Sequence, residues 1–400
     1  SAQDPNGLAD LAARYLQILD NGDLSLNDLC YSASLGRTHW SYRLSVICKE
    51  REDLVEGLKS YLDGTVNPNV QFGQVAAQQP KIAFLFTGQG SQYATMGAHL
   101  YATELVFKTA FDRCDEIFQS LTQQSIKSII FEQGSDSIHE TGITQPALFS
   151  LAYSLCQLWS AWGIKPQTVM GHSVGEYAAA CSAGIFSLED GLRLISKRAA
   201  LMQSLPTGGA MAALFCSRET ITPFLANYQQ QVEIAAVNSP KQILVSGDKD
   251  AIVRLCNELT AAKIDSHILN VSHAFHSYLM DDILSEFKLE AERIQYNKPE
   301  HSIVSNLSGT EANETLFSSQ YWVEHIRRPV EFSTGMQTIE DKAIDAYIEI
   351  GPEPILLGLA KQNTTRTPVW LASLRKSVPD QVQMYRALAG LYVLGADIKW

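Results

Sequence analysis

The chain has 400 residues, of which 46% are hydrophobic and 18% charged, and this composition excludes a disordered or fibrous protein. Its length exceeds what one hydrophobic core usually organises, so two or three structural units are expected. The formal net charge of −12 argues against nucleic acid as a partner, because nucleic-acid-binding proteins usually present a basic face.

Neither a membrane span nor a secretion signal is expected from the residues of this sequence. No apolar run approaches the roughly 20 residues that cross a bilayer, and the first residues lack the basic and apolar regions of a secretory leader. We therefore expect the chain to be a piece of a longer protein. Seven cysteines are scattered along the chain and never form a C-x-x-C pair, which indicates reduced thiols in a cytoplasmic protein.

The first 78 residues predict a small α/β unit. Apolar residues at helical spacing predict a helix over 7–21, and a strand over 43–48 precedes a second helix over 52–62. The stretch 64–80 is polar and rich in Asn, Gln and Pro, which is typical of a surface linker. The first domain boundary is expected near residue 78.

A larger α/β domain follows. The apolar run 82–86, bounded by Gly88, predicts a buried parallel strand. Alternating helices and strands then predict a mostly parallel sheet. The expected helices cover 146–162, 176–183 and 188–205, and the further strands cover 168–170, 303–305 and 346–350.

Between about residues 208 and 270 the pattern changes to a split βαβ order. The expected strands cover 210–215, 232–237, 242–246 and 266–269, and the helices cover 219–228 and 250–262. This order predicts an inserted ferredoxin-like subdomain.

The strongest motif is Gly171-His172-Ser173-Val174-Gly175, which lies between an expected strand and an expected helix. In this context G-x-S-x-G exposes a serine on a strained turn, and the helix N-terminus favours a developing negative charge. A helix-capping serine is the alternative interpretation. We expect Ser173 to be a nucleophile.

A serine nucleophile needs a base, and a histidine is expected. His273 and His276 follow the last strand of the insert, where the chain returns to the large domain, and one of them is the expected base. No third metal ligand accompanies this H-x-x-H pair, so no metal site is predicted.

The glycine-rich segment Thr87-Gly88-Gln89-Gly90-Ser91-Gln92 follows the strand over 82–86. It lacks the G-K-[ST] ending of a P-loop, which argues against nucleotide binding. Such a loop also suits an oxyanion hole. The expected donors are the backbone N–H groups of Gln89 and Val174.

Five motifs occur in one order along the chain: residues 86–92, Thr144-Gln145-Pro146-Ala147-Leu148, residues 171–176, Arg198, and His273-Ala274-Phe275-His276. Together they resemble the acyltransferase domains of modular polyketide synthases, and they are similar to malonyl-CoA:acyl-carrier-protein transacylases. The resemblance implies an α/β-hydrolase-like large domain with an inserted ferredoxin-like subdomain, preceded by a small α/β linker domain.

The resemblance also implies domain limits. Residues 1–78 correspond to a ketosynthase-acyltransferase linker, 79–206 and 271–375 to the acyltransferase core, and 207–270 to the ferredoxin-like subdomain. Residues 376–400 correspond to a C-terminal helix and the start of the linker that follows the acyltransferase.

By resemblance, Ser173 is the nucleophile, His276 is its base, and the N–H groups of Gln89 and Val174 form the oxyanion hole. Arg198 is similar to the arginine that pairs with the free carboxylate of a malonyl group. A guanidinium suits this because it holds a carboxylate with two parallel hydrogen bonds.

Other pocket residues are implied in the same way. Gln145 resembles a substrate-binding glutamine, and His273 and Phe275 belong to a malonyl-type signature. Phe275 would fill the space that the methyl of a methylmalonyl group needs. Where relatives orient the catalytic histidine through a backbone carbonyl of Asn or Gln, this chain has His325, so the His325 carbonyl is the expected orienter.

The implied function is transfer of an extender unit, most of all malonyl, from acyl-CoA to Ser173 and then to the phosphopantetheine of an acyl carrier protein. No bound cofactor is expected. The expected partners are malonyl-CoA, the carrier protein, and the ketosynthase and other domains of a parent synthase. The alternatives are a transferase selective for methylmalonyl or another acyl group and, less favoured, an esterase or thioesterase or a catalytically silent docking module.

Overall fold

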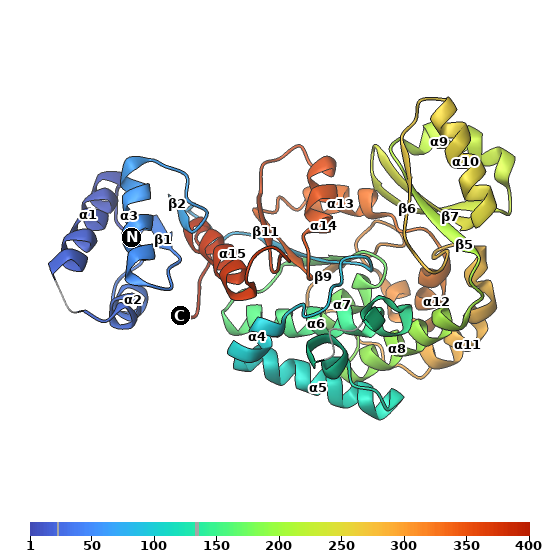
Figure 1. The fold of residues 1–400 in the computed structure, drawn as a ribbon, viewed down its shortest axis with the longest axis horizontal. Coiled ribbons are helices and arrows are strands. Elements are labelled where there is room, and N and C mark those ends of the chain that lie inside the picture. The colour runs from blue at the N-terminus through green and yellow to red at the C-terminus, as the bar shows by residue number, and fades with distance from the viewer. Residues whose placement is uncertain (22–23, 133–135) are drawn as a thin grey trace.

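The computed structural model describes residues 1–21, 24–132 and 136–400. A small N-terminal unit lies at one end of the molecule, and the larger α/β domain carries a separate antiparallel sheet at the other end (Figure 1). Among the described residues, no helix is long and apolar enough to span a membrane.

The N-terminal unit consists of a two-stranded sheet with helices packed on it. Its elements are α1 (Pro5–Asn21), α2 (Leu26–Leu35), β1 (Tyr42–Val46), α3 (Arg51–Asp63) and β2 (Val70–Gln74). The prediction of a linker over 64–80 missed β2, which pairs antiparallel with β1. All its residues are half-buried or exposed, so the sequence there carries little of the apolar signal of a strand.

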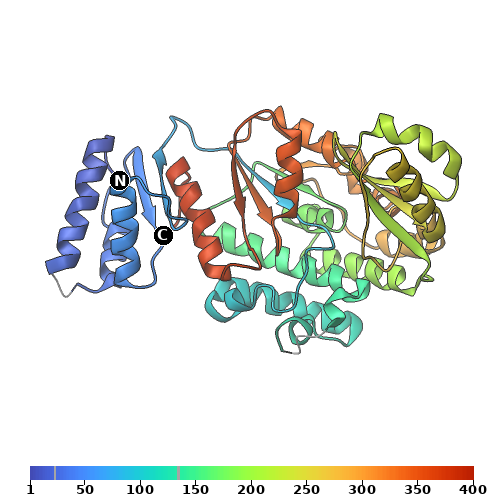
Figure 2. The ribbon, with the colours of Figure 1, turned by 45° about the horizontal axis from the view of Figure 1, so that its top comes forward.

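Helix α15 (Asp380–Leu394) joins this unit to the large domain (Figure 2). It packs on β1 and β2 on one side and on the edge strand of the central sheet on the other. Arg43 donates a hydrogen bond to the backbone oxygen of Tyr392 over 2.8 Å. The C-terminal helix α15 is therefore packed against the N-terminal unit.

The central sheet has five parallel strands in the order β11-β10-β3-β4-β9, which confirms the predicted parallel sheet. The strands are β3 (Ile82–Phe86), β4 (Thr168–Gly171), β9 (Ser302–Val304), β10 (Ala346–Ile350) and β11 (Val369–Ala372). Residues of β3 alternate between the two faces: Phe84 and Phe86 enter one core cluster, and Ala83 and Leu85 enter the other. Burial on both faces explains the unbroken apolar run.

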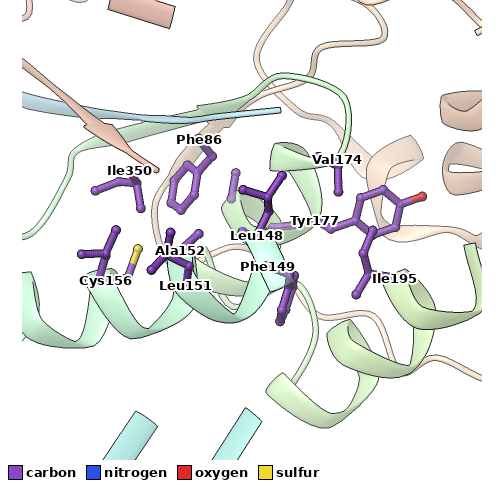
Figure 3. Packing of buried hydrophobic residues seen from close by; sticks show 14 of the residues in the cluster. Phe86, Leu148, Phe149, Leu151, Ala152, Cys156, Val174, Tyr177, Ile195 and Ile350 are labelled. Carbon is purple, nitrogen blue, oxygen red and sulfur yellow. The ribbon is translucent and has the colours of Figure 1, made fainter. Parts of the chain in front are cut away.

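Helices cover both faces of this sheet. One face carries α4 (Ala98–Thr103), α5 (Leu105–Thr122), α6 (Thr141–Ala161), α7 (Gly175–Ser182) and α8 (Leu188–Ser204), and the other carries α13 (Phe332–Glu340) and α14 (Ile355–Ala360). Figure 3 shows Phe86 and Ile350 packed against Leu151, Ala152 and Cys156 of α6. Helix α6 begins five residues before the predicted start, so Gln145 lies inside it.

The inserted subdomain confirms the ferredoxin-like prediction. Its antiparallel sheet has the order β6-β7-β5-β8. The elements are β5 (Gly209–Leu214), α9 (Arg218–Leu225), β6 (Val232–Ser239), β7 (Gln242–Asp248), α10 (Lys249–Ala261) and β8 (Ser266–Ile268). After β8 the chain returns to the large domain through α11 (Asp281–Ala291) and α12 (Ser319–Arg327), which pack against each other.

A buried glutamate holds the C-terminal end of the central sheet together. Glu349 of β10 is 1% exposed, and its carboxyl accepts hydrogen bonds from the backbone N–H groups of Leu356 and Leu357 and from the Thr87 hydroxyl. Thr87 opens the glycine-rich loop, so this carboxyl links β10, helix α14 and that loop.

Replacing Glu349 by Ala should lower the free energy of unfolding by about 3 kcal/mol, because two buried N–H groups and a hydroxyl lose their acceptor. Chemical denaturation monitored by circular dichroism measures the change. Glu56→Ala on the exposed face of α3 is the control and should leave the transition where it is. Equal midpoints for both variants would contradict the linking role.

Candidate active site

Ser173 lies on a sharp turn between β4 and α7. Strand β4 ends at Gly171 and helix α7 begins at Gly175, and Ser173 has a φ of 50°, a left-handed conformation that side-chain-bearing residues rarely adopt. A side chain at Gly171 would collide with the Glu176 backbone, and one at Gly175 would collide with Phe86. The two glycines therefore permit the turn that the motif predicts.

His276 is the histidine that the fold brings to Ser173. Its Nε2 lies 2.7 Å from Ser173 Oγ, and its Nδ1 lies 2.9 Å from the backbone oxygen of Arg328. A carbonyl can only accept, so the proton is on Nδ1, and Nε2 is free to accept the serine proton. Burial, together with the charges of Arg198 and His325, holds the pKa of His276 well below its usual range, so the ring is neutral at pH 7.

The expectation for His325 is wrong: the carbonyl bonded to His276 is that of Arg328. His325 lies within α12, whereas Arg328 follows the helix in an extended conformation that turns its carbonyl away from the helix. The His325 side chain is instead buried, with Nε2 2.9 Å from Glu176 Oε2.

The glycine-rich loop lies beside the serine, and Gln89 lines the same cavity. Among the hydrogen bonds of residues 1–21, 24–132 and 136–400, none uses the backbone N–H of Gln89 or of Val174. The Gln89 side chain donates to the Thr141 hydroxyl over 3.3 Å. Both predicted donor groups are thus available to a bound oxygen.

Arg198 of α8 is a buried cation without an anionic partner among the described residues. It is 1% exposed, donates through Nη1 to Gln145 Oε1 over 2.6 Å, and has Nη2 3.4 Å from Ser173 Oγ. Its Nε has no hydrogen-bond partner in the described part of the chain. Burial lowers the pKa of this guanidinium, because a desolvated charge is costly unless an anion compensates it.

A cavity of about 370 Å³ opens over Ser173 between the large domain and the subdomain. His276, Phe275 and Gln89 line it, whereas Arg198, Gln145 and His273 are not among its lining residues. His273 is buried, and its ring nitrogens contact the Ser272 hydroxyl and the Leu205 backbone oxygen. In this structure His273 therefore holds the loop against the end of α8.

Glu176, the first acidic residue of α7, has buried contacts that the sequence analysis did not predict. Its carboxyl is fully buried and contacts the Tyr321 hydroxyl, the Asn306 backbone and side-chain amides, and the His325 ring. The signal available in the sequence was an acidic residue directly after the serine motif, in a helix that is otherwise apolar.

Residues 83–397 match the sequence profile of the family described as "Acyl transferase domain". The chain belongs to this family. Residues 1–58 match a second profile, "CurL-like, PKS C-terminal". The relatives and solved structures identify it further as an acyltransferase domain of the polyketide synthase kind, related to malonyl-CoA:acyl-carrier-protein transacylases.

This chain is 34% identical over 415 aligned positions to polyketide synthase GfsA of Streptomyces halstedii. The match covers 100% of this chain and 6% of that protein. The acyltransferase domain from the second module of the salinomycin polyketide synthase is 35% identical with a TM-score of 0.86, covering 100% of this chain and 94% of the other. A malonyl CoA-acyl carrier protein transacylase from Clostridium perfringens is 26% identical with a TM-score of 0.72, covering 78% and 97%.

Burial raises the pKa of Glu176 to about 8, which makes the stability of the domain depend on pH. Between about pH 5 and 8 the folded state keeps a proton that the unfolded state has released, so stability from this group falls as pH rises. Relative to the Glu176→Gln variant, the wild type should lose up to about 1.4 kcal/mol of unfolding free energy per pH unit. Urea denaturation across this range measures the difference, with the exposed Glu56→Gln as control; a difference that does not change with pH would contradict the assignment.

Proposed function

We propose that this domain transfers a dicarboxylic acyl group, most of all malonyl, from CoA to Ser173 and then to the phosphopantetheine thiol of an acyl carrier protein. Two observations together carry the proposal. Ser173 is hydrogen-bonded to a neutral histidine, and a buried guanidinium without an anionic partner among the described residues lies 3.4 Å from the serine oxygen. A serine and histidine alone would suit any acyl chemistry.

The proposed reaction has two half-reactions. Ser173 Oγ attacks the thioester carbonyl while His276 Nε2 takes its proton, and the N–H groups of Gln89 and Val174 hold the oxyanion. The carbon–sulfur bond breaks, and the CoA sulfur leaves with the proton from His276. The phosphopantetheine thiol then attacks the acyl-serine ester and gives its proton to His276, which returns it to Ser173 Oγ as the ester breaks.

Arg198 supplies the preference for a dicarboxylic acyl group. A malonyl group on Ser173 carries a carboxylate, which would compensate the buried guanidinium. Gln145 Oε1 accepts a hydrogen bond from Arg198 Nη1 in this structure. In this proposal Gln145 orients the Arg198 guanidinium and also contacts the bound carboxylate. Acyl groups without a carboxylate would leave the cation unpaired, and their transfer would be slower.

Phe275 favours malonyl over branched extender units. It is 8% exposed and lines the cavity beside Ser173, so its ring takes up space that a substituent on C2 of the acyl group would need. A methylmalonyl-selective transferase remains the alternative, and a comparison of the two CoA esters distinguishes them.

We also propose the domain limits given by the resemblance: a ketosynthase-acyltransferase linker over 1–78, the acyltransferase core over 79–206 and 271–375, the subdomain over 207–270, and the start of the following linker over 376–400. The match of residues 1–58 to a polyketide synthase profile supports the first of these. The parent synthase would supply the ketosynthase and the carrier protein, and the transfer needs no metal or bound cofactor.

An esterase or thioesterase is the second enzymatic candidate, because the same serine turn occurs in hydrolases. In those enzymes a carboxylate holds the histidine, whereas here a backbone carbonyl does so. The unpaired Arg198 would also have no purpose in a general esterase. A long-lived acyl-enzyme supports transfer, and rapid release of free malonate supports hydrolysis.

Ser173→Ala should abolish covalent labelling by malonyl-CoA, because the variant lacks the attacking oxygen. Intact-protein mass spectrometry after incubation with malonyl-CoA measures the added mass. The exposed Ser308→Ala is the control and should label like the wild type. Persistent labelling of the Ser173 variant would refute the nucleophile.

Arg198→Ala should reduce kcat/KM for malonyl-CoA by about a hundredfold or more, because a buried carboxylate loses its charged partner, while acetyl-CoA becomes the relatively better substrate. Lys197→Ala removes the neighbouring cation, which pairs with Glu286 at the surface, and serves as the control. A competition assay with the two esters gives the ratio. If that ratio is the same in the wild type and the Arg198 variant, Arg198 does not select the substrate.

A further inference from the structure

The fully buried carboxyl of Glu176 lies at the start of the helix that follows Ser173. Its Oε1 accepts from the Tyr321 hydroxyl over 2.7 Å and from the Asn306 backbone N–H over 3.1 Å. Its Oε2 accepts from the Asn306 side-chain amide and lies 2.9 Å from His325 Nε2. Four contacts thus reach one carboxyl from two other segments of the chain.

These contacts link the serine to the group that orients its base. Tyr321 and His325 are on α12, which ends at Arg327, and the next residue supplies the carbonyl bonded to His276 Nδ1. His276 in turn contacts Ser173, which lies three residues before Glu176. These contacts therefore form a closed loop, which runs from Ser173 through Glu176 and α12 to the Arg328 carbonyl and returns through His276.

The pair of Glu176 and His325 carries no net charge near pH 7. Burial raises the pKa of Glu176 to about 8, and burial with the nearby charges of Arg198 and His172 holds the pKa of His325 well below its usual range. Burial also raises the pKa of Tyr321, which keeps its hydroxyl a donor. A protonated Glu176 can donate from Oε2 to His325 Nε2, which lies 2.9 Å away.

The charged and titratable groups facing this pair come from several elements. Tyr321 is on α12, Arg198 is on α8, and His276 and His172 lie on the loops of the serine site. No second carboxylate is among the described groups that shift these pKa values. Ionisation of Glu176 would therefore place a negative charge in a buried site, where the loss of hydration outweighs the hydrogen bonds from Tyr321 and Asn306.

We propose that Glu176, His325 and Asn306 form a positioning clamp, which holds α12 against α7 and thereby keeps the Arg328 carbonyl on His276 Nδ1. The clamp touches no substrate. It acts on the base by fixing which nitrogen carries the proton, and its working form is the one in which Glu176 is protonated. This inference rests on the proposed roles of Ser173 and His276.

A clamp of this kind predicts different effects for two substitutions at one position. Glu176→Gln keeps the size, stays neutral at every pH, and can donate from its amide to His325. Glu176→Ala removes the contacts of this carboxyl to Tyr321 and His325 of α12, so α12 positions the Arg328 carbonyl less firmly and the orientation of His276 is weakened. A displacement of about 1 Å at a reacting group costs about a hundredfold in rate.

The experiment measures the rate constant for acylation of Ser173 by malonyl-CoA in rapid-quench single turnovers from pH 6 to 9. Glu176→Ala should lower the maximal acylation rate at pH 7 about a hundredfold. The malonyl-CoA concentration that gives half of the maximal rate should stay unchanged. Glu176→Gln should stay within about threefold of the wild type at pH 7. The ratio of wild-type to Gln-variant rate should fall above about pH 8, since only the wild type ionises.

Asp115→Ala is the matched control, because Asp115 of α5 has a buried carboxyl that accepts from the Ser125 hydroxyl and the Lys127 backbone N–H, and its hydrogen bonds in the described part of the chain involve neither α7 nor α12. It should lose stability without any change in the pH profile. A Glu176→Ala rate equal to that of folded wild type, or a ratio that is constant through pH 8, would overturn the clamp. Absence of labelling in the wild type itself would instead overturn the proposed function.

Discussion

The contact between Ser173 Oγ and His276 Nε2 is the constraint around which the rest of the site is built. The two residues are 103 positions apart, and both are held in the left-handed region, with φ values of 50° and 56°. Such conformations cost of order 1–3 kcal/mol each. The surrounding packing must offset that cost, and the turn also requires glycine at 171 and 175, where a side chain would collide with the neighbouring backbone.

Arg198 imposes the second constraint, because its guanidinium is buried and Gln145 is a neutral partner. An isolated buried charge is unfavourable unless an anion or hydrogen bonds compensate it. The same reasoning separates the buried carboxyls of Glu349 and Glu176. Glu349 faces donors from α14 and the glycine-rich loop, whereas Glu176 also faces a ring nitrogen that can accept its proton.

The sequence was sufficient for features that local pattern determines. The run 82–86, the turn around Ser173 and the βαββαβ order of the insert each follow from periodicity and glycine placement, and the structure has all three. Strand β2 was missed because its residues are half-exposed. The Arg328 carbonyl could not be predicted from side-chain identity, because every residue carries a carbonyl and only the end of α12 decides which one points at His276. The contacts of Glu176 depend on residues 130 and 145 positions away.

The segment that orients His276 also attaches the subdomain. Val330, two residues after Arg328, donates to the Ala235 backbone oxygen over 2.9 Å and accepts from the Val237 N–H over 2.8 Å. These bonds tie β6 to the large domain at the wall of the cavity, which Ala235 and Val330 both line. A shift of the subdomain would therefore change the shape of the cavity and the position of the Arg328 carbonyl together. The width of the cavity and the orientation of His276 are consequently coupled through one short stretch of backbone.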